Sequence, residues 1–263
     1  IWSCLVGSEM CIRDRKLNSQ INIVLTNEKL EKGFEKLKNL GFKLSHFPLI
    51  KTLPIKLDLN FNISDFNCII FTSKNGVEYF LKNKLVQKTK LNERYFVCIG
   101  EKTAQKLKEL GFEPGYICKR NYSEFMSEEL KNKEVLKNKK SLLVQGSLSD
   151  NKLIESLKSF SDTEKIISYS TELVNKKYSD LEKITKKYKT YVVFTSPSSF
   201  DSFIKFYDAS KVNLVSIGNT TSSHITNLGF QTILTSKMQS YEGISESLIA
   251  FFNENKQYEL SKN

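Results

Sequence analysis

The feature that most constrains the fold of this chain is a pattern that occurs twice. In each copy an apolar run ends in small hydroxyl residues and passes directly into helical spacing: CIIFTSKNGVEYF at residues 68–80 and VVFTSPSSFDSF at residues 192–203. The apolar runs predict buried strands, and the spacing that follows predicts helices. Ser73 or Asn75 can cap the first helix, and Ser196 can cap the second. We therefore expect, twice, a strand, a tight turn and a helix start whose backbone N–H groups can bind an anion.

These two copies belong to a longer internal repeat. Gly100 opens GEKTA and Gly218 opens GNTTS, and eleven positions further on each copy has a second glycine, Gly111 or Gly229, within LGF. The segments EFMSEEL and EGISESL then begin 24 positions after Gly100 and Gly218. The chain is therefore predicted to contain two versions of one α/β unit.

Further strands and helices are expected around these motifs. Apolar runs predict strands at residues 21–26, 95–99, 115–118 and 142–145, and helical spacing predicts helices at residues 30–40, 103–110 and 153–160 and from Ser123 onward. Gly41 and Gly111 follow two of these helices and are expected to end them. Residues 42–57 contain Pro48 and Pro54, so we expect an extended segment that crosses between domains.

The repeat also predicts how the domains are threaded. An extra strand and helix, residues 142–160, follow the first copy, whereas only a polar tail follows the second, and residues 21–40 resemble the missing piece. We expect a discontinuous domain of residues 16–50 plus 170–263 and an inserted domain of residues 53–167. Each would be an α/β domain with a parallel, Rossmann- or flavodoxin-like sheet, and ligands of such sheets bind at the carboxyl ends of the strands. The site is therefore expected in a cleft between the domains.

Composition limits the classes of function. With 263 residues, of which 40% are hydrophobic and 26% charged, the chain can form one large or two medium globular domains. No apolar run approaches the roughly 20 residues that span a bilayer, so no membrane association is expected. Five cysteines without C-x-x-C spacing and two distant histidines give no metal signature and suit a reducing cytoplasm.

The formal net charge of +11 raises the question of a nucleic-acid partner. The lysines fall on predicted helix faces, such as Lys29, Lys32 and Lys36, without arginine clusters or interleaved aromatic residues. A nucleic-acid-binding module is therefore the weakest of the candidate functions, and we expect no nucleic acid. A net positive field still favours a polyanionic partner, including a small molecule with many carboxylates.

Residues 1–15 differ in composition from the rest of the chain. They contain the one tryptophan and two of the five cysteines, and they lack lysine and asparagine. No basic start precedes their apolar residues, so they do not form a signal peptide. We expect this segment to be extraneous, not part of the native fold.

Five motifs in this order and spacing resemble the uroporphyrinogen-III synthase family across about residues 20 to 252: FTSKNGV, CIGEKTAQKL with LGF, ISYSTEL, FTSPSSF, and SIGNTT with LGF. The resemblance implies a monomeric, cofactor-free two-domain α/β enzyme whose domains are joined by a two-stranded linker. Its reaction, in porphyrin and haem biosynthesis, closes the linear tetrapyrrole hydroxymethylbilane to uroporphyrinogen III, with loss of water and inversion of ring D. That substrate carries eight carboxylates, which suits a positive field.

The resemblance also assigns site residues. Tyr169 corresponds to the tyrosine usually proposed as the acid, and the substrate-binding positions fall on Thr72, Ser73, Asn75, Gly100, Thr103, Thr195, Ser196, Pro197, Gly218, Thr220 and Thr221. Hydroxyls and backbone N–H groups at helix starts can hold carboxylates without fixed counter-charges. Each hydroxyl could equally be a helix cap, and Tyr169 could be a packed strand residue. Many family members have arginine where this chain has Asn27 and Gln145.

One alternative from another class remains, because the fold alone does not determine activity. The chain could be a non-catalytic two-domain protein that closes over an anionic ligand, with Tyr169 serving only to pack.

Deletion of residues 1–15 should leave the unfolding temperature and any activity unchanged, because the segment is expected to lie outside the folded domains. Thermal unfolding of the truncated and full chains tests this. A fall of more than about 4 °C, which exceeds the effect of about 1 kcal/mol in a chain of this size, would show that the segment is part of the fold.

Overall fold

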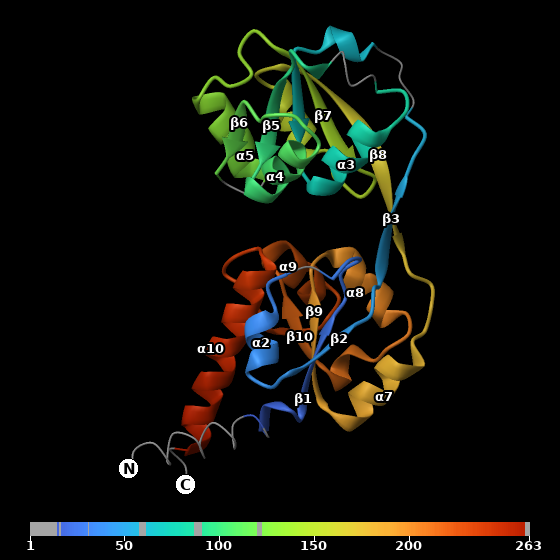
Figure 1. The fold of residues 1–263 in the computed structure, drawn as a ribbon, viewed down its shortest axis with the longest axis vertical. Helices are drawn as coiled ribbons and strands as arrows, with labels where there is room; N and C mark the ends of the chain where they lie inside the picture. The colour runs from blue at the N-terminus through green and yellow to red at the C-terminus, as the bar shows by residue number, and fades with distance from the viewer. Residues whose placement is uncertain are drawn as a thin grey trace. The chain divides into compact units, whose positions relative to one another are not determined.

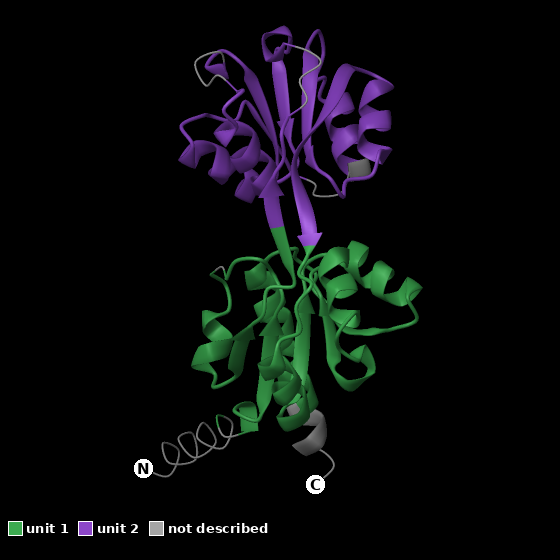
Figure 2. Ribbon diagram, turned by 90° about the vertical axis from the view of Figure 1, so that its right-hand side faces the viewer, with its two compact units in different colours: residues 1–51, 173–263 green, residues 52–172 purple. Residues whose placement is uncertain are grey.

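The computed structural model describes residues 15, 17–30, 32–57, 62–86, 91–119 and 123–260. Strands and helices mostly alternate along the chain from β1 to α10, although β3 follows β2 directly (Figure 1). The packing of Cα atoms divides the chain into two compact units: unit 1 contains residues 1–51 and 173–263, and unit 2 contains residues 52–172 (Figure 2). Residues 1–15, expected to be extraneous, lie outside the described residues except for Arg15, whose backbone lies against Gly41.

Unit 2 is built around a six-stranded sheet in the order β3-β8-β7-β4-β5-β6. Every pair from β8 to β6 is parallel. The strands are β3 (Ile50–Pro54), β4 (Cys68–Phe71), β5 (Tyr95–Ile99), β6 (Tyr116–Cys118), β7 (Lys140–Gly146) and β8 (Asp162–Leu173). The helices are α3 (Lys74–Lys82), α4 (Glu101–Glu109), α5 (Ser123–Asn132) and α6 (Lys152–Lys158), with a short 3₁₀ helix, η1 (Ile63–Asp65), before β4.

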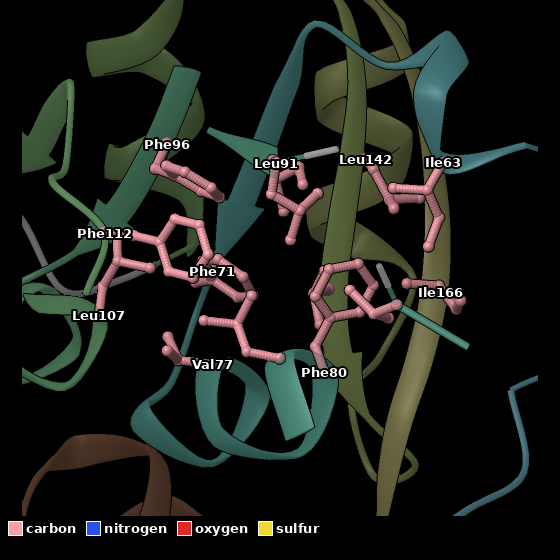
Figure 3. Close-up of a cluster of buried hydrophobic side chains, with 14 of the residues drawn as sticks. Ile63, Phe71, Val77, Phe80, Leu91, Phe96, Leu107, Phe112, Leu142 and Ile166 are labelled. Carbon is pink, nitrogen blue, oxygen red and sulfur yellow. The ribbon is translucent and has the colours of Figure 1, made fainter. Parts of the chain in front are cut away.

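Helices cover both faces of this sheet because alternate side chains of each strand point to opposite faces. On β4, Ile69 and Phe71 pack in the cluster that contains residues of α3 and α4, whereas Cys68 and Ile70 pack with residues of α5 and α6. Figure 3 shows the first cluster, in which the ring of Phe71 packs 6.1 Å, centroid to centroid, from that of Phe96. The buried strands predicted from apolar runs are therefore the centre of a three-layer unit.

Unit 1 has the same architecture around a five-stranded parallel sheet in the order β11-β10-β9-β1-β2. The strands are β1 (Ile21–Leu25), β2 (Lys43–His46), β9 (Lys189–Phe194), β10 (Asn213–Ser216) and β11 (Thr232–Thr235). The helices are α2 (Glu35–Asn39), α7 (Ser179–Lys187), α8 (Pro197–Ile204), α9 (Asn219–Asn227) and α10 (Tyr241–Leu260), with the 3₁₀ helix η3 (Ala209–Lys211). One buried cluster joins α2 and α10 to the sheet and a second joins α7, α8 and α9. No described helix is both long and apolar enough to cross a bilayer.

The strand orders confirm the internal repeat. In the two sheets, β4, β5 and β6 correspond to β9, β10 and β11. With this match, β7 and β8 take the places that β1 and β2 have in the other sheet. The strand at Ile21–Leu25 is therefore the missing piece of the second copy, as predicted from the sequence.

The helix predicted at residues 30–40 is wrong in length. Helix α2 covers only Glu35–Asn39, and Leu30 and Leu40 are 63% and 42% exposed. Gly33 has a φ of +126°, and a Cβ placed on it would lie 2.8 Å from the Cβ of Tyr241. This turn against the start of α10 interrupts the helical spacing, which no local signal in the sequence reveals.

The segment of residues 42–57, predicted to be extended and to cross between domains, also supplies a strand to each sheet. The segment is extended, but it contains β2, which pairs in parallel with β1 at the edge of the unit 1 sheet, and β3 of the other sheet. Pro48 lies between these strands, and its carbonyl accepts a hydrogen bond of 2.9 Å from the hydroxyl of Tyr178. Pro54 is the last residue of β3, and the boundary between the two units, at Lys51 and Thr52, lies between the two prolines.

Leu107→Ala should lower the free energy of unfolding by about 2–5 kcal/mol, because Leu107 is fully buried between α4 and the sheet. Leu85→Ala is the matched control in the same unit, since Leu85 is 52% exposed, and it should change stability by less than about 0.5 kcal/mol. Urea unfolding measures both. Equal shifts of the two midpoints would contradict the described core.

Candidate functional site

The predicted site residues of unit 2 meet at one edge of its sheet. Thr72 and Ser73 directly follow β4, and Gly100 directly follows the neighbouring strand β5. Tyr169 lies in β8, which is separated from β4 only by β7. Because these strands are parallel, their carboxyl ends share an edge, where ligand sites of such sheets are found.

Ser73 is the N-cap of α3, which decides between the two caps that the sequence allowed. Its backbone is extended, and its Oγ accepts a hydrogen bond of 3.0 Å from the N–H of Gly76. The same Oγ lies 3.2 Å from the hydroxyl oxygen of Tyr169. Ser73 therefore caps the helix and also contacts the candidate acid.

Tyr169 is placed by an irregularity in the pairing of β7 with β8. Gln145 pairs with Ile167, but the next residue, Gly146, pairs with Tyr169, so Ser168 is an extra residue on β8. A Cβ placed on Gly146 would lie only 2.5 Å from Cζ and 2.8 Å from the hydroxyl oxygen of Tyr169. The glycine and the bulge together allow the tyrosine ring to lie across the end of β7.

Tyr79 of α3 holds the ring of Tyr169. The two rings are stacked with centroids 5.5 Å apart and planes inclined by 22°. The hydroxyl of Tyr79 donates a hydrogen bond of 2.8 Å to the carbonyl of Thr52, and its oxygen lies 3.0 Å from the Oγ1 of the same threonine. Neither Tyr79 nor Gly146 is predicted from the sequence, although Tyr79 follows the capping serine by under two helical turns.

The remaining unit 2 positions lie in the first turns of α3 and α4. Asn75 is half-buried within α3. Gly100 precedes α4 with a φ of +72°, a conformation that favours glycine, and it caps the helix without a side chain. Thr103 is buried in the first turn of α4. These residues therefore lie at the starts of α3 and α4.

The unit 1 positions form an equivalent edge. Thr195 and Ser196 directly follow β9, and the Oγ of Ser196 accepts a hydrogen bond of 3.2 Å from the N–H of Ser199 at the start of α8. The structure confirms Pro197 at the first helical position. Three site positions lie around the start of α9. Gly218 is the residue before the helix, Thr220 is exposed and Thr221 is buried.

Asn27 and Gln145, where the resemblance implies arginine in many family members, are both buried. The side-chain amide of Asn27 donates to the carbonyl of Lys29, while the backbone carbonyl oxygen of Asn27 lies 2.7 Å from Nε2 of His46. The Oε1 atom of Gln145 is buried without a hydrogen-bond partner among the described residues. Neither side chain supplies the positive charge that an arginine would place there.

The described cysteines lie in surroundings that disfavour a reactive thiolate. Cys68, Cys98 and Cys118 are buried free thiols, and burial raises the pKa of each to about 12. Thiols of such pKa stay protonated and unreactive at neutral pH. Within the described ranges, no group of three or more His, Cys, Asp or Glu side chains could hold a metal ion.

Two parallel sheets of matching strand order, each with hydroxyl residues at its helix starts, define a class of duplicated α/β proteins. Within that class, the family model of uroporphyrinogen-III synthase HemD matches residues 34–246, and the chain belongs to this family. The resemblance of the five sequence motifs is thereby confirmed.

Similar proteins agree with this assignment. The porphyrin biosynthesis protein HemD of Ruminiclostridium josui is 26% identical over 234 residues, which are 82% of this chain and 45% of that protein, so the chain spans under half of its length. The crystal structure of uroporphyrinogen-III synthetase from Helicobacter pylori matches with a TM-score of 0.67 and 22% identity, over 88% of this chain and 99% of that one. A mutant uroporphyrinogen III synthase from Thermus thermophilus matches with a TM-score of 0.56 and 13% identity, over 89% of this chain and 99% of that one. These structures establish the α/β fold with its mostly parallel sheets.

Gly146→Ala should displace the ring of Tyr169 and lower stability by about 1–3 kcal/mol, because the added methyl group overlaps the ring. Gly76→Ala is the control: its nearest neighbour would be the Oγ of Ser73 at an ordinary 3.4 Å, and alanine favours the helix. Urea unfolding and the near-ultraviolet circular dichroism of the tyrosines measure the two effects. If the two variants change stability and the circular dichroism equally, the absence of a side chain at Gly146 is not what makes room for the ring of Tyr169.

Proposed function

We propose that this protein is a uroporphyrinogen-III synthase, which cyclises hydroxymethylbilane to uroporphyrinogen III with loss of water and inversion of ring D. Family membership supports this activity, and the observation that carries it is the hydroxyl of Tyr169, held 3.2 Å from the capping hydroxyl of Ser73 at the carboxyl edge of the unit 2 sheet. No observation supports the alternative of a non-catalytic binding protein.

The reaction needs an acid, because a hydroxyl group leaves carbon readily only as water. A phenol has an ordinary pKa of about 10 and keeps its proton at neutral pH. In the proposed step, the C–O bond of the substrate breaks, its electron pair stays on the oxygen, and the oxygen takes the proton of Tyr169. The cation left on the substrate is stabilised by its own pyrrole nitrogen.

Ring closure then forms a carbon–carbon bond between the cationic methylene carbon and the substituted α-carbon of the last pyrrole. The bond from that α-carbon to its original methylene bridge breaks, and the bridge carbon, left as a cation, bonds to the free α-carbon of the same pyrrole, which inverts that ring. The proton released when this pyrrole regains aromaticity replaces the one that Tyr169 gave, so the enzyme returns to its starting state. The protein must therefore supply an acid and hold the chain in the geometry that favours this carbon.

The eight carboxylates of the substrate are proposed to bind at the helix starts. Backbone N–H groups and hydroxyls lie there in both copies, and the start of an α-helix carries partial positive charge. The net charge of +11 adds an attraction that is not tied to any one side chain. We propose that residues 16–50 plus 170–263 and residues 53–167 act as two domains that both contribute such positions, in a cytoplasmic monomer.

The direct test supplies hydroxymethylbilane to the purified protein and separates the product isomers. Spontaneous closure gives the symmetric type I ring, so the proposed function requires enrichment of the type III ring above the enzyme-free control. A mixture that equals the control would overturn it.

Tyr169→Phe should lower turnover by about 10²–10⁴-fold, because the variant keeps the ring and loses the acid. Thr103→Ala and Ser196→Ala should cost much less, since neighbouring N–H groups share each carboxylate. Steady-state kinetics of type III formation measures all three variants. If Tyr169→Phe keeps more than about a tenth of the turnover, the acid is another group and the tyrosine only positions it.

A further inference from the structure

The two copies of the repeat contain two capping serines with different surroundings. Ser73 has φ −156° and ψ 155°, Ser196 has φ −158° and ψ 156°, and each Oγ accepts the N–H of the residue three positions on. The Oγ of Ser73 also lies 3.2 Å from the tyrosine hydroxyl, whereas that of Ser196 lies 3.0 Å from the hydroxyl of Ser198. Capping accounts for a serine in both places, but it does not account for the contact with Tyr169.

Among the described residues, the hydroxyl proton of Ser73 has one possible acceptor. A serine hydroxyl has one proton and two acceptor positions, and the N–H of Gly76 occupies one of these. Among the described residues, the other partner of this Oγ is the hydroxyl oxygen of Tyr169. Once Tyr169 directs its own proton to a substrate, the contact persists only if Ser73 donates.

We propose that Ser73 is a positioning residue that donates a hydrogen bond to the oxygen of Tyr169, aiming the tyrosine proton at the leaving hydroxyl and stabilising the phenolate that remains. This inference rests on the proposed function and deepens it. The proton that moves belongs to Tyr169 and is later replaced from the substrate, while the proton of Ser73 stays on its own oxygen.

The strength of this bond changes in the direction that catalysis needs. A hydrogen bond to a charged oxygen is stronger than one to a neutral oxygen, so the bond gains strength as the phenolate forms. Ser73 is itself held at the start of α3, where the helix dipole is positive and favours negative charge nearby. An interaction that is stronger in the transition state than in the ground state lowers the barrier.

The packing around Tyr169 keeps its hydroxyl oxygen next to the Oγ of Ser73. The stacked ring of Tyr79 lies on the same helix that Ser73 caps, so helix and tyrosine ring are fixed to each other at two points. Gly146 leaves room for the ring on the side of β7. The donor and its acceptor are therefore preorganised before any substrate binds.

Glycine and threonine variants separate donation from capping. Glycine is well tolerated at an N-cap, and threonine keeps the hydroxyl. Ser73→Gly should lower kcat by about 10- to 100-fold with little change in KM, which is the size expected from a charge-assisted bond made only in the transition state. Ser73→Thr should restore kcat. Ser196→Gly, which removes an equivalent cap and a proposed carboxylate contact, should act mainly on KM.

Two further readouts exclude a merely structural effect. The alkaline limb of the kcat profile should move to higher pH in Ser73→Gly, because the phenolate loses a donor. In the Tyr169→Phe background, Ser73→Gly should lower kcat no further, since its effect acts through the tyrosine. Equal kcat in Ser73→Gly and wild type, or a full additional loss in the double variant, would overturn the proposal.

A spectroscopic measurement of the hydrogen bond requires no turnover, so its result does not depend on the proposed function. With ¹³C-labelled tyrosine rings, the ζ-carbon resonance of Tyr169 is the one that disappears in Tyr169→Phe. It should shift in Ser73→Gly, return in Ser73→Thr and stay in place in Ser196→Gly. If the wild type fails to enrich the type III isomer but the resonance shifts as expected, the hydrogen bond is supported and the proposed function is wrong. If the ζ-carbon resonance of Tyr169 does not shift in Ser73→Gly, the inference itself is wrong.

Discussion

The parallel pairing of β4 with β7, and of β7 with β8, is the constraint on which the candidate site depends. Parallel strands end at the same edge, so residues nearly a hundred positions apart, Ser73 and Tyr169, meet without any local signal linking them. Both faces of the sheet are covered by helices, and the aromatic cluster around Phe71 fixes α3 against β4. The position of the capping serine, and through it the tyrosine contact, thus follows from how the core packs.

Duplication explains what the two units share, and an irregular strand explains how the tyrosine site differs from its counterpart. The two sheets match in strand order, and both place a capped helix after the central strand. Strand β2, the counterpart of β8, pairs with β1 in regular register, whereas β8 has an extra residue opposite the end of β7. Tyr169 directly follows that extra residue and stacks on Tyr79 of α3. A bulge re-aims a side chain at little cost to the rest of a sheet, which is why bulges occur beside functional sites.

The sequence predicted the elements whose signals are local. Buried strands such as Tyr95–Ile99, helix stops such as Gly111 and the cap at Ser73 follow from apolar runs, backbone preferences and side-chain hydrogen bonding, and all are present. The helix expected from Leu30 begins late because Gly33 packs against α10, which is distant in sequence. The position of the Tyr169 ring could likewise not be predicted from the sequence, because the bulge and the stacking on Tyr79 exist only once β7, β8 and α3 have assembled.

The buried asparagine and glutamine suggest how such a site can hold a polyanion without arginines. Asn27, which contacts neighbouring groups, and Gln145, which is buried at the end of β7 beside the bulge, are neutral amides and supply no fixed positive charge. In the proposed mode of binding, hydroxyls and backbone N–H groups at several helix starts would spread the attraction over many weak contacts. Such an arrangement favours binding of a ligand with many carboxylates and still permits its release, because no single buried ion pair has to be broken for the product to leave.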